Sequence, residues 1–287
     1  MIIVTGATGL LGRQTVERLL TRVPAEQVGV SVRDPQKARA LADRGVRVRQ
    51  GSFTDPAGLA HALEGASQVL LVSVDRMGEA CVAQHRNAIG AAVAAGARRI
   101  VYTSQMGADP ASHFQACRDH AATEDLLRAC GVPFTALRNG FYASSAAHFL
   151  QQALASGQLA LPADGPFAWT AHADLAEAAA AVLAGEVRFD GPTPPLTAGP
   201  AYDFADLAEL AAGVTGRAMS RSVLSDEEFQ AQLVAHGTPA ELAAQLGGIF
   251  AAARAGEFAT VDPALAALLG REPVGVGEVL REALAQG

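Results

Sequence analysis

Short apolar runs of strand length alternate with longer Ala- and Leu-rich segments along the first half of the chain. The runs are rich in β-branched residues and comprise Ile2–Val4, Val28–Val32, Val46–Arg49, Val69–Ser73, Arg99–Ser104 and Phe134–Arg138. Most of the segments between them repeat apolar residues at helical spacing. This alternation predicts an α/β fold in which a parallel sheet is wound on both faces by helices. Ligands of such sheets bind at the carboxyl ends of the strands.

Several predicted helix boundaries carry residues suited to them. Asp34 and Asp55 each precede a proline, so each is expected to cap a helix whose first turn begins with that proline. Gly96 and Gly131 are expected to end helices just before strands. These boundaries agree with the alternation of strands and helices.

The pattern becomes irregular beyond Gly140, with Pro and Gly clusters at Leu161–Pro166 and Asp190–Pro200. A helix over Asp174–Leu183, capped by Asp174, is expected to interrupt it. Further helices are predicted at Phe204–Val214, Asp226–His236 and Pro239–Ala255. We therefore expect a nucleotide-binding domain at residues 1–145, joined by a returning helix near 172–185. Residues 146–287 would form a smaller α/β lobe that holds a substrate over the strand ends.

Composition narrows the classes of partner. Of 287 residues, 50% are hydrophobic and 18% are charged, which is enough apolar material for a large core. The net charge of −7, without a concentrated basic run, argues against nucleic acid. The apolar runs are too short to span a membrane and no signal-peptide pattern is present, so we expect a cytoplasmic protein. The cysteines are scattered and odd in number, so neither a disulfide framework nor a metal site is expected.

A glycine-rich loop follows the first apolar run. In the stretch GATGLLG, Gly6, Gly9 and Gly12 stand three residues apart, directly before a segment with helical periodicity. Such a loop leaves backbone N–H groups unpaired at a helix N-terminus, where the helix dipole favours a phosphate. Glycines allow the close approach that a Cβ would block. The first half therefore reads as a Rossmann-type dinucleotide-binding unit, although the spacing differs from G-x-G-x-x-G.

The residues after the second strand bear on which dinucleotide is bound. Arg33 comes directly after VGVSV, and Lys37 lies one helical turn further on. A guanidinium suits the 2′-phosphate of NADP, whereas NAD enzymes place an acid here for the ribose hydroxyl. Asp34 is adjacent and fits that acid, but its place before a proline favours a helix cap. Arg13 offers a second cation near the phosphates. We expect NADPH in preference to NADH.

Several longer segments resemble one family, the NmrA-like atypical short-chain dehydrogenases/reductases. They occur in the family's order and are GATGLLG, VRDPQKARAL, AQHRNAIGAAVAAGARRIVYTS, ATEDLLRACGVPFTALRNGFY and HADLAEAAAAVL. The branch with the greatest similarity is that of the type 2 NAD(P)H:quinone oxidoreductases, with triphenylmethane dye reductases as near relatives. The R-N-G-x-Y stretch from Arg138 to Tyr142, with His120-x-x-x-Glu124, does most to select this branch. The likeness is specific to about Ala184 and looser beyond.

The resemblance implies a set of cofactor contacts. The loop would bind the pyrophosphate, Arg33 the 2′-phosphate, and residues at later strand ends the rest of the cofactor. The implied contacts are Gly6, Thr8, Gly9, Leu10, Leu11, Arg33, Ser73, Val74, Thr103, Ser104 and Asn139. The glycine loop and the cations after the second strand add Gly12 and Lys37. Ser73 and Ser104 have a second interpretation as residues that merely terminate strands.

The chain lacks the acid/base pair of ordinary short-chain dehydrogenases. Those enzymes use a Tyr phenol with a Lys four residues later. Lys37 is the only lysine here, and by the resemblance Ala116 and His120 occupy the Tyr and Lys positions. His120 would hydrogen-bond the nicotinamide ribose or the substrate, unless it is simply a helix histidine bonded to a neighbour. Reduction of a quinone tolerates this loss, because the product is a resonance-stabilised phenolate that water can protonate.

The expected reaction is therefore reduction of a quinone-like acceptor by direct hydride transfer from NADPH, without flavin. His120, Asn139 and Tyr142 are the candidate catalytic residues. Tyr142 and Phe141 would stack on a planar acceptor or else belong to the core, with Trp169 and Phe167 as weaker candidates.

Two other functions are compatible with the fold. An NADP(H)-sensing regulator that binds a partner would fit the missing pair equally well. A nucleotide-sugar epimerase is disfavoured, because it needs the Tyr/Lys chemistry. A homodimer is compatible with the sequence, which names no physiological acceptor.

Overall fold

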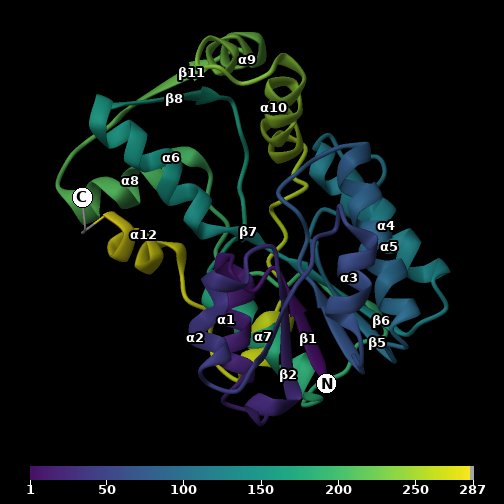
Figure 1. Ribbon diagram of the computed structural model, residues 1–287. Helices are drawn as coiled ribbons and strands as arrows, with labels where there is room; N and C mark the ends of the chain where they lie inside the picture. Colours follow the sequence, from purple (N-terminus) through teal and green to yellow (C-terminus); the bar gives the residue numbers. More distant parts are fainter. Residues whose placement is uncertain (285–287) are drawn as a thin grey trace.

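The computed structural model describes residues 1–284 and is built around a parallel sheet (Figure 1). Within that range seven strands pair in the order β10-β6-β5-β4-β1-β2-β3, all parallel. They are β1 (Ile2–Thr5), β2 (Val28–Val32), β3 (Arg47–Gln50), β4 (Gln68–Leu71), β5 (Arg99–Gln105), β6 (Phe134–Asn139) and β10 (Gly191–Pro192). The order reverses between β1 and β4, and this switch point is where doubly wound sheets bind ligands. The predicted fold class is confirmed.

Helices cover both faces of the sheet and bury its alternating apolar side chains. On one face lie α1 (Leu10–Leu19), α2 (Arg39–Ala42), α7 (His172–Ala184) and α11 (Ala264–Leu269). On the other lie α3 (Pro56–Leu63), α4 (Glu79–Ala94) and α5 (Gln115–Ala129). Two short 3-10 helices, η1 (Ala25–Gln27) and η2 (Pro35–Ala38), flank β2. Because α7 returns to pack on α1, the late helix completes the early half of the sheet.

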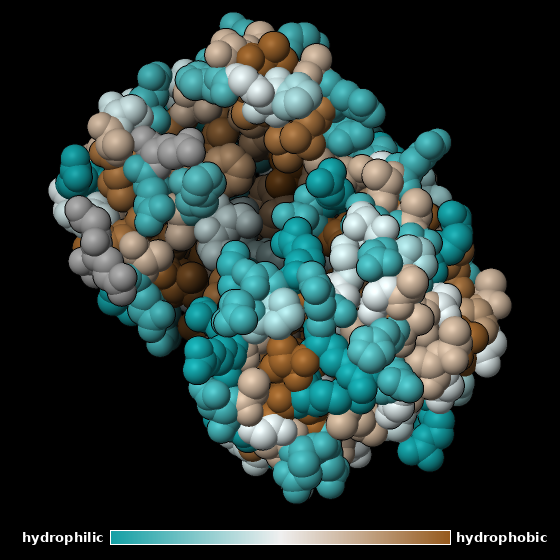
Figure 2. All heavy atoms as spheres, viewed as in Figure 1, coloured by the Kyte–Doolittle hydropathy of each residue, from teal (hydrophilic) through white to brown (hydrophobic). Residues whose placement is uncertain are grey.

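A second group of elements lies beyond the carboxyl ends of the strands (Figure 1). It contains α6 (Ala143–Ser156), β8 (Gln158–Pro162), α8 (Phe204–Thr215), β11 (Ser220–Leu224), α9 (Asp226–Ala235), α10 (Ala240–Arg254) and α12 (Val276–Leu284). Short strands β7 (Phe141–Tyr142) and β9 (Trp169–Thr170) connect it to the sheet. Its core is separate and rich in phenylalanine. Figure 2 shows the surface hollowed between this group and the sheet.

Most predicted elements occur where expected, with one clear correction. Helix α7 begins at His172, so Asp174 is not its cap, contrary to the sequence-based prediction. Asp174 is instead fully buried and holds the chain before α12, accepting bonds from Arg271 Nη2 at 2.6 Å and from Val274 N at 2.6 Å. The sequence analysis also missed α6, although its end at left-handed Gly157 is an ordinary helix signal. No helix in residues 1–284 is long and apolar enough to cross a membrane.

Candidate cofactor-binding and active site

The loop between β1 and α1 is compact because of two of its glycines. Gly6 has a φ of +63°, a left-handed conformation that favours glycine. A Cβ on Gly12 would lie 2.3 Å from Gly6 O, so only glycine lets the helix pack this closely on the loop. Gly9 has an ordinary φ of −80°, is exposed, and donates its N–H to Gly6 O at 3.0 Å. The loop is therefore pre-formed, and open space lies above Gly9.

The first turn of α1 presents free backbone donors beside this loop. No side chain caps the helix, so the N–H groups of its first residues lack intrahelical partners. Leu10 is 43% exposed, whereas the side chains of Leu11 and Thr15 are buried. Leu11 and Gly12 can thus reach a ligand through their backbone only. The arrangement suits a phosphate group.

Arg33 emerges from the carboxyl end of β2 at the edge of an open pocket of about 710 Å³. Arg33 is exposed, and within residues 1–284 its guanidinium makes no hydrogen bond or ion pair. Lys37 in η2 is exposed too. Arg49 lines the same pocket but is paired with Glu64 at 2.9 Å. Asp34 accepts the N–H of Gln36 at 3.0 Å, which confirms that it caps η2. Arg33 is therefore the available cation for an anionic ligand group here.

The ends of β4 and β5 are tied together by hydroxyl groups. Ser73 N donates to Thr103 Oγ1 at 2.8 Å, and Thr103 Oγ1 donates to Ser73 Oγ at 3.2 Å. Val74 N donates to His85 Nε2 on α4 at 3.1 Å. These bonds place Ser73, Val74 and Thr103 next to the switch point between β1 and β4, where the sequence predicted cofactor contacts.

Asn139 ends β6 and has a buried acceptor without a partner. Its side chain is 2% exposed, and within residues 1–284 no group donates to its Oδ1. Burial raises the pKa of Tyr142. A hydrogen bond with the Asn139 side chain lowers that pKa and so offsets part of the rise. The Tyr142 ring packs against the His172 ring, with centroids 4.1 Å apart. Since buried polar atoms are usually satisfied, the orphaned Oδ1 points to a ligand that donates there.

His120 lies on α5 and is held by a tyrosine from β5. Its Nδ1 is 2.7 Å from the hydroxyl oxygen of Tyr102. Burial lowers the pKa of His120 to about 3, so the imidazole is neutral at pH 7. Sequence reasoning missed Tyr102, because a tyrosine inside an apolar strand reads as core. His120 and Asn139 lie on α5 and β6, two elements that are in contact with each other.

The two family motifs meet in a buried ion pair. Arg138 Nε and Nη2 contact Glu124 Oε1 at 3.0 Å and Oε2 at 2.8 Å. Ser104 Oγ donates to the same carboxylate at 2.7 Å. Ser104, predicted as a cofactor contact, thus has its hydroxyl committed to Glu124. The motif residues join α5 to β6, and so set the spacing between His120 and Asn139.

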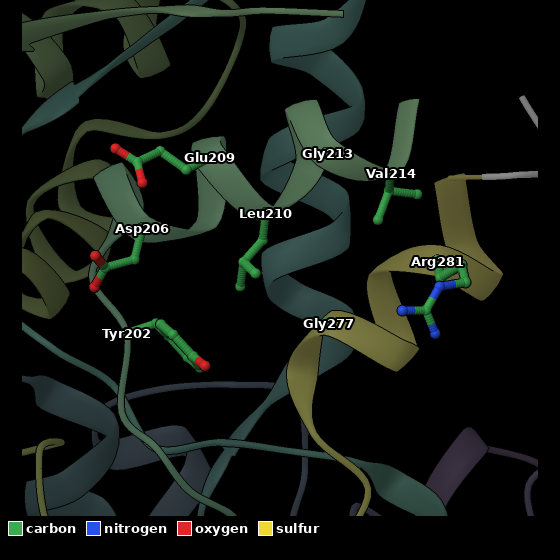
Figure 3. A pocket seen from close by; sticks show the side chains of 8 residues that line it. All are labelled: Tyr202, Asp206, Glu209, Leu210, Gly213, Val214, Gly277 and Arg281. Atoms are coloured by element: carbon green, nitrogen blue, oxygen red, sulfur yellow. The ribbon is translucent and has the colours of Figure 1, made fainter. Parts of the chain in front are cut away.

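The other aromatic candidates belong to the second core. Phe167 and Trp169 are buried and stacked with centroids 4.6 Å apart, and Phe141 packs edge-on against both. These contacts favour a packing role for all three. A separate pocket of about 560 Å³ between α8 and α12 contains none of the predicted site residues (Figure 3). Within residues 1–284 no group of three or more His, Cys, Asp or Glu side chains is arranged to hold a metal ion.

The loop, the switch point and the strand-end side chains together define a dinucleotide-binding protein of the Rossmann class. Comparison with known families identifies the particular one. Residues 6–186 match the model of the NAD(P)H-binding family, and the chain belongs to it. Quinone oxidoreductase 2 of Escherichia coli strain K12 is 36% identical over 279 residues, covering 97% of this chain and 96% of that protein.

Solved structures show the same relationship across the whole chain. A crystal structure of an NADPH-dependent quinone oxidoreductase from Escherichia coli, complexed with NADPH, superposes with a TM-score of 0.91 at 36% identity, covering 99% of this chain and 100% of that one. The triphenylmethane reductase of a Citrobacter species, complexed with NADP(H), gives a TM-score of 0.89 at 33% identity, covering 99% and 100%. The chain is thus an NAD(P)H-dependent oxidoreductase.

Proposed function

We propose that this protein reduces quinone-like acceptors with NADPH by direct hydride transfer, without a flavin. When bound, the reduced nicotinamide supplies the hydride. The loop glycines and the α1 N-terminus bind the pyrophosphate, and Arg33 binds the 2′-phosphate. Asn139 Oδ1 accepts a hydrogen bond from the carboxamide group of the nicotinamide. The second group of elements, which contains α6, β8, α8, β11, α9, α10 and α12, holds the acceptor above the strand ends.

The observation that carries this proposal is the neutrality of the groups at the strand ends. His120 has a pKa of about 3, and Tyr142 has a pKa raised by burial, so neither exchanges a proton readily near pH 7. A reaction that forms an alkoxide needs a proton donor in place. Hydride addition to a quinone forms a stabilised phenolate and does not. The site is therefore suited to positioning two planar partners rather than to acid/base work.

Mixing the purified protein with NADPH and 1,4-benzoquinone tests the proposal. We expect nicotinamide absorbance to fall at a rate proportional to enzyme, in protein that shows no flavin absorbance and gains nothing from added flavin. Tight NADPH binding without turnover of any quinone would instead favour the NADP(H)-sensing regulator. A requirement for added flavin would overturn the direct-transfer mechanism.

Arg33 should discriminate NADPH from NADH. Because its guanidinium is otherwise unpartnered, Arg33→Ala removes a charge-assisted bond to the 2′-phosphate and nothing else. We expect NADPH binding to weaken by about 1–3 kcal/mol, with NADH binding unchanged. Calorimetric titration with both nucleotides measures this, and Lys37→Ala serves as the matched control with a smaller effect. Equal losses for the two nucleotides would contradict the assignment.

Asn139 should matter more to turnover than His120 does. Asn139→Ala removes the buried acceptor beside the reacting ring, so we expect kcat to fall. His120→Ala removes a neutral donor, so we expect mainly a higher KM. Steady-state kinetics with NADPH and a simple quinone separate the two. A kcat loss of roughly 10²–10⁴-fold in the histidine variant alone would show that His120 donates the proton.

A further inference from the structure

We propose that Tyr102 and His85 are positioning residues that hold His120 as the Nε2–H tautomer, making Nε2–H a fixed hydrogen-bond donor at the cofactor-facing edge of the sheet. The inference rests on a chain of hydrogen bonds whose direction can be followed from one end. It deepens the proposed function by giving His120 a defined role.

The chain of hydrogen bonds begins at the end of β4. Val74 N–H can only donate, so His85 Nε2 must accept and carries no proton. Burial lowers the pKa of His85 to about 4, which leaves the ring neutral with its proton on Nδ1. Thr123 Oγ1, 2.9 Å from that Nδ1, donates its own proton to Asp119 O at 2.8 Å and therefore accepts from His85. The tautomer of His85 is thus settled by a backbone N–H and a backbone carbonyl.

The protonation of His85 in turn determines how the Tyr102 hydroxyl is oriented. Tyr102 is fully buried, and its oxygen lies 3.5 Å from the protonated Nδ1 of His85. Because this Nδ1 carries the proton that is donated to Thr123 Oγ1, it has no lone pair to accept the Tyr102 hydroxyl proton. The short contact of 2.7 Å to His120 Nδ1 is where that proton goes. Burial raises the pKa of Tyr102 well above its usual value, so the phenol remains a donor.

His120 then has a single arrangement. With Nδ1 accepting from Tyr102 and the ring neutral, the ring proton is on Nε2. Within residues 1–284 no hydrogen bond engages Nε2, and this atom is not among the buried unpaired ones, so it is open to a ligand. A neutral imidazole held in this way donates to a ribose hydroxyl or a carbonyl oxygen without needing a lysine. The chain of bonds thereby fixes the direction of a donor at this position, without the charge that Lys would have supplied.

The ring tautomers are observable directly by NMR of protein labelled with ¹⁵N at histidine. Two-bond ¹H–¹⁵N correlations at pH 7 distinguish a protonated from a bare ring nitrogen, and the His120→Asn variant assigns the signals. We expect Nε2–H for His120 and Nδ1–H for His85. An Nδ1–H or doubly protonated His120 in the unmodified protein would overturn the proposal. This readout needs no turnover, so it stands or falls independently of the quinone reductase assignment.

Tyr102→Phe tests the positioning role, with Tyr202→Phe as the matched control. Loss of the hydroxyl should give His120 a mixture of tautomers and lower kcat/KM by about 2- to 12-fold, mainly through KM. The control should leave both unchanged. In a His120→Ala background, Tyr102→Phe should have no further effect, because it acts through the missing ring. Additive losses in the double variant would mean that Tyr102 is only structural and would overturn the proposal.

Discussion

Gly9→Val is expected to abolish NADPH binding while leaving a folded protein. Gly9 has an ordinary φ, and an added Cβ would meet only Gly6 O, at 3.3 Å, so the backbone tolerates a side chain with a small shift. The valine methyl groups would then occupy the space where the pyrophosphate meets the α1 N-terminus. Losing two or more charge-assisted bonds there costs at least about 3 kcal/mol, or more than roughly 100-fold in affinity.

Calorimetry and thermal unfolding with and without NADPH measure this loss. The control is Gly90→Val on α4, where an added Cβ has nothing within 4 Å. It introduces the same residue at an exposed helical position, where Val has a slightly higher helix propensity than Gly, and should retain binding. If NADPH still protects the Gly9→Val protein against heat as it protects the parent, then the loop is only a turn.

Acid should destabilise this protein steeply, beginning near pH 6.5. Burial lowers the pKa of His85 and His172 to about 4 and that of His120 to about 3. Between those values and the ordinary pKa of about 6.5, the unfolded chain binds protons that the folded protein does not, so the free energy of unfolding falls as the pH falls. Each histidine lowers the free energy of unfolding by up to about 1.4 kcal/mol per pH unit, and the three together lower it by about 4 kcal/mol per pH unit.

Two carboxylates oppose this trend, because burial raises the pKa of Asp119 as well as that of Asp164. Burial raises the pKa of Asp164 to about 6, despite its ion pair with Arg221, so the folded protein gains a proton there before the unfolded chain does. That gain in stability offsets roughly one histidine. Since folded domains are stable by about 5–15 kcal/mol, the remaining loss is enough to unfold much of the population between pH 5 and pH 4.

Urea unfolding at pH 7, 6 and 5 measures the slope. His172→Phe keeps a ring against Tyr142 but removes the titrating group, so it should flatten the pH dependence by about a third above pH 6 and by about half below it. His61→Gln is the control, because that side chain is exposed and outside the buried histidines. An unchanged slope in the His172 variant would show that its proton uptake does not limit stability.

The local order of the chain was readable from the sequence wherever one segment alone carries the signal. The signals for strands β1 to β6, the glycine loop, and the Asp34 and Asp55 caps lie in periodicity and turn chemistry within a few residues. The helices α8, α9 and α10 were placed within a residue or so of their ends for the same reason. Strand β10, which pairs with β6, was not predicted. Helix α6 has apolar positions at helical spacing, but they face α8 and α12, which lie far along the chain.

The candidate site divides along the same line. By itself the sequence determined that a nucleotide-binding loop, a cation after β2 and polar strand ends share one edge, because parallel strands bring their carboxyl ends together. Only the tertiary structure decided that Ser104 is committed to Glu124 and that Asp174 anchors the segment before α12. The contacts from His85 through Tyr102 to His120 were likewise decided only by the tertiary structure. Side chains on separate helices and strands meet there, and hydrogen-bond direction depends on distances that spacing along the chain does not specify.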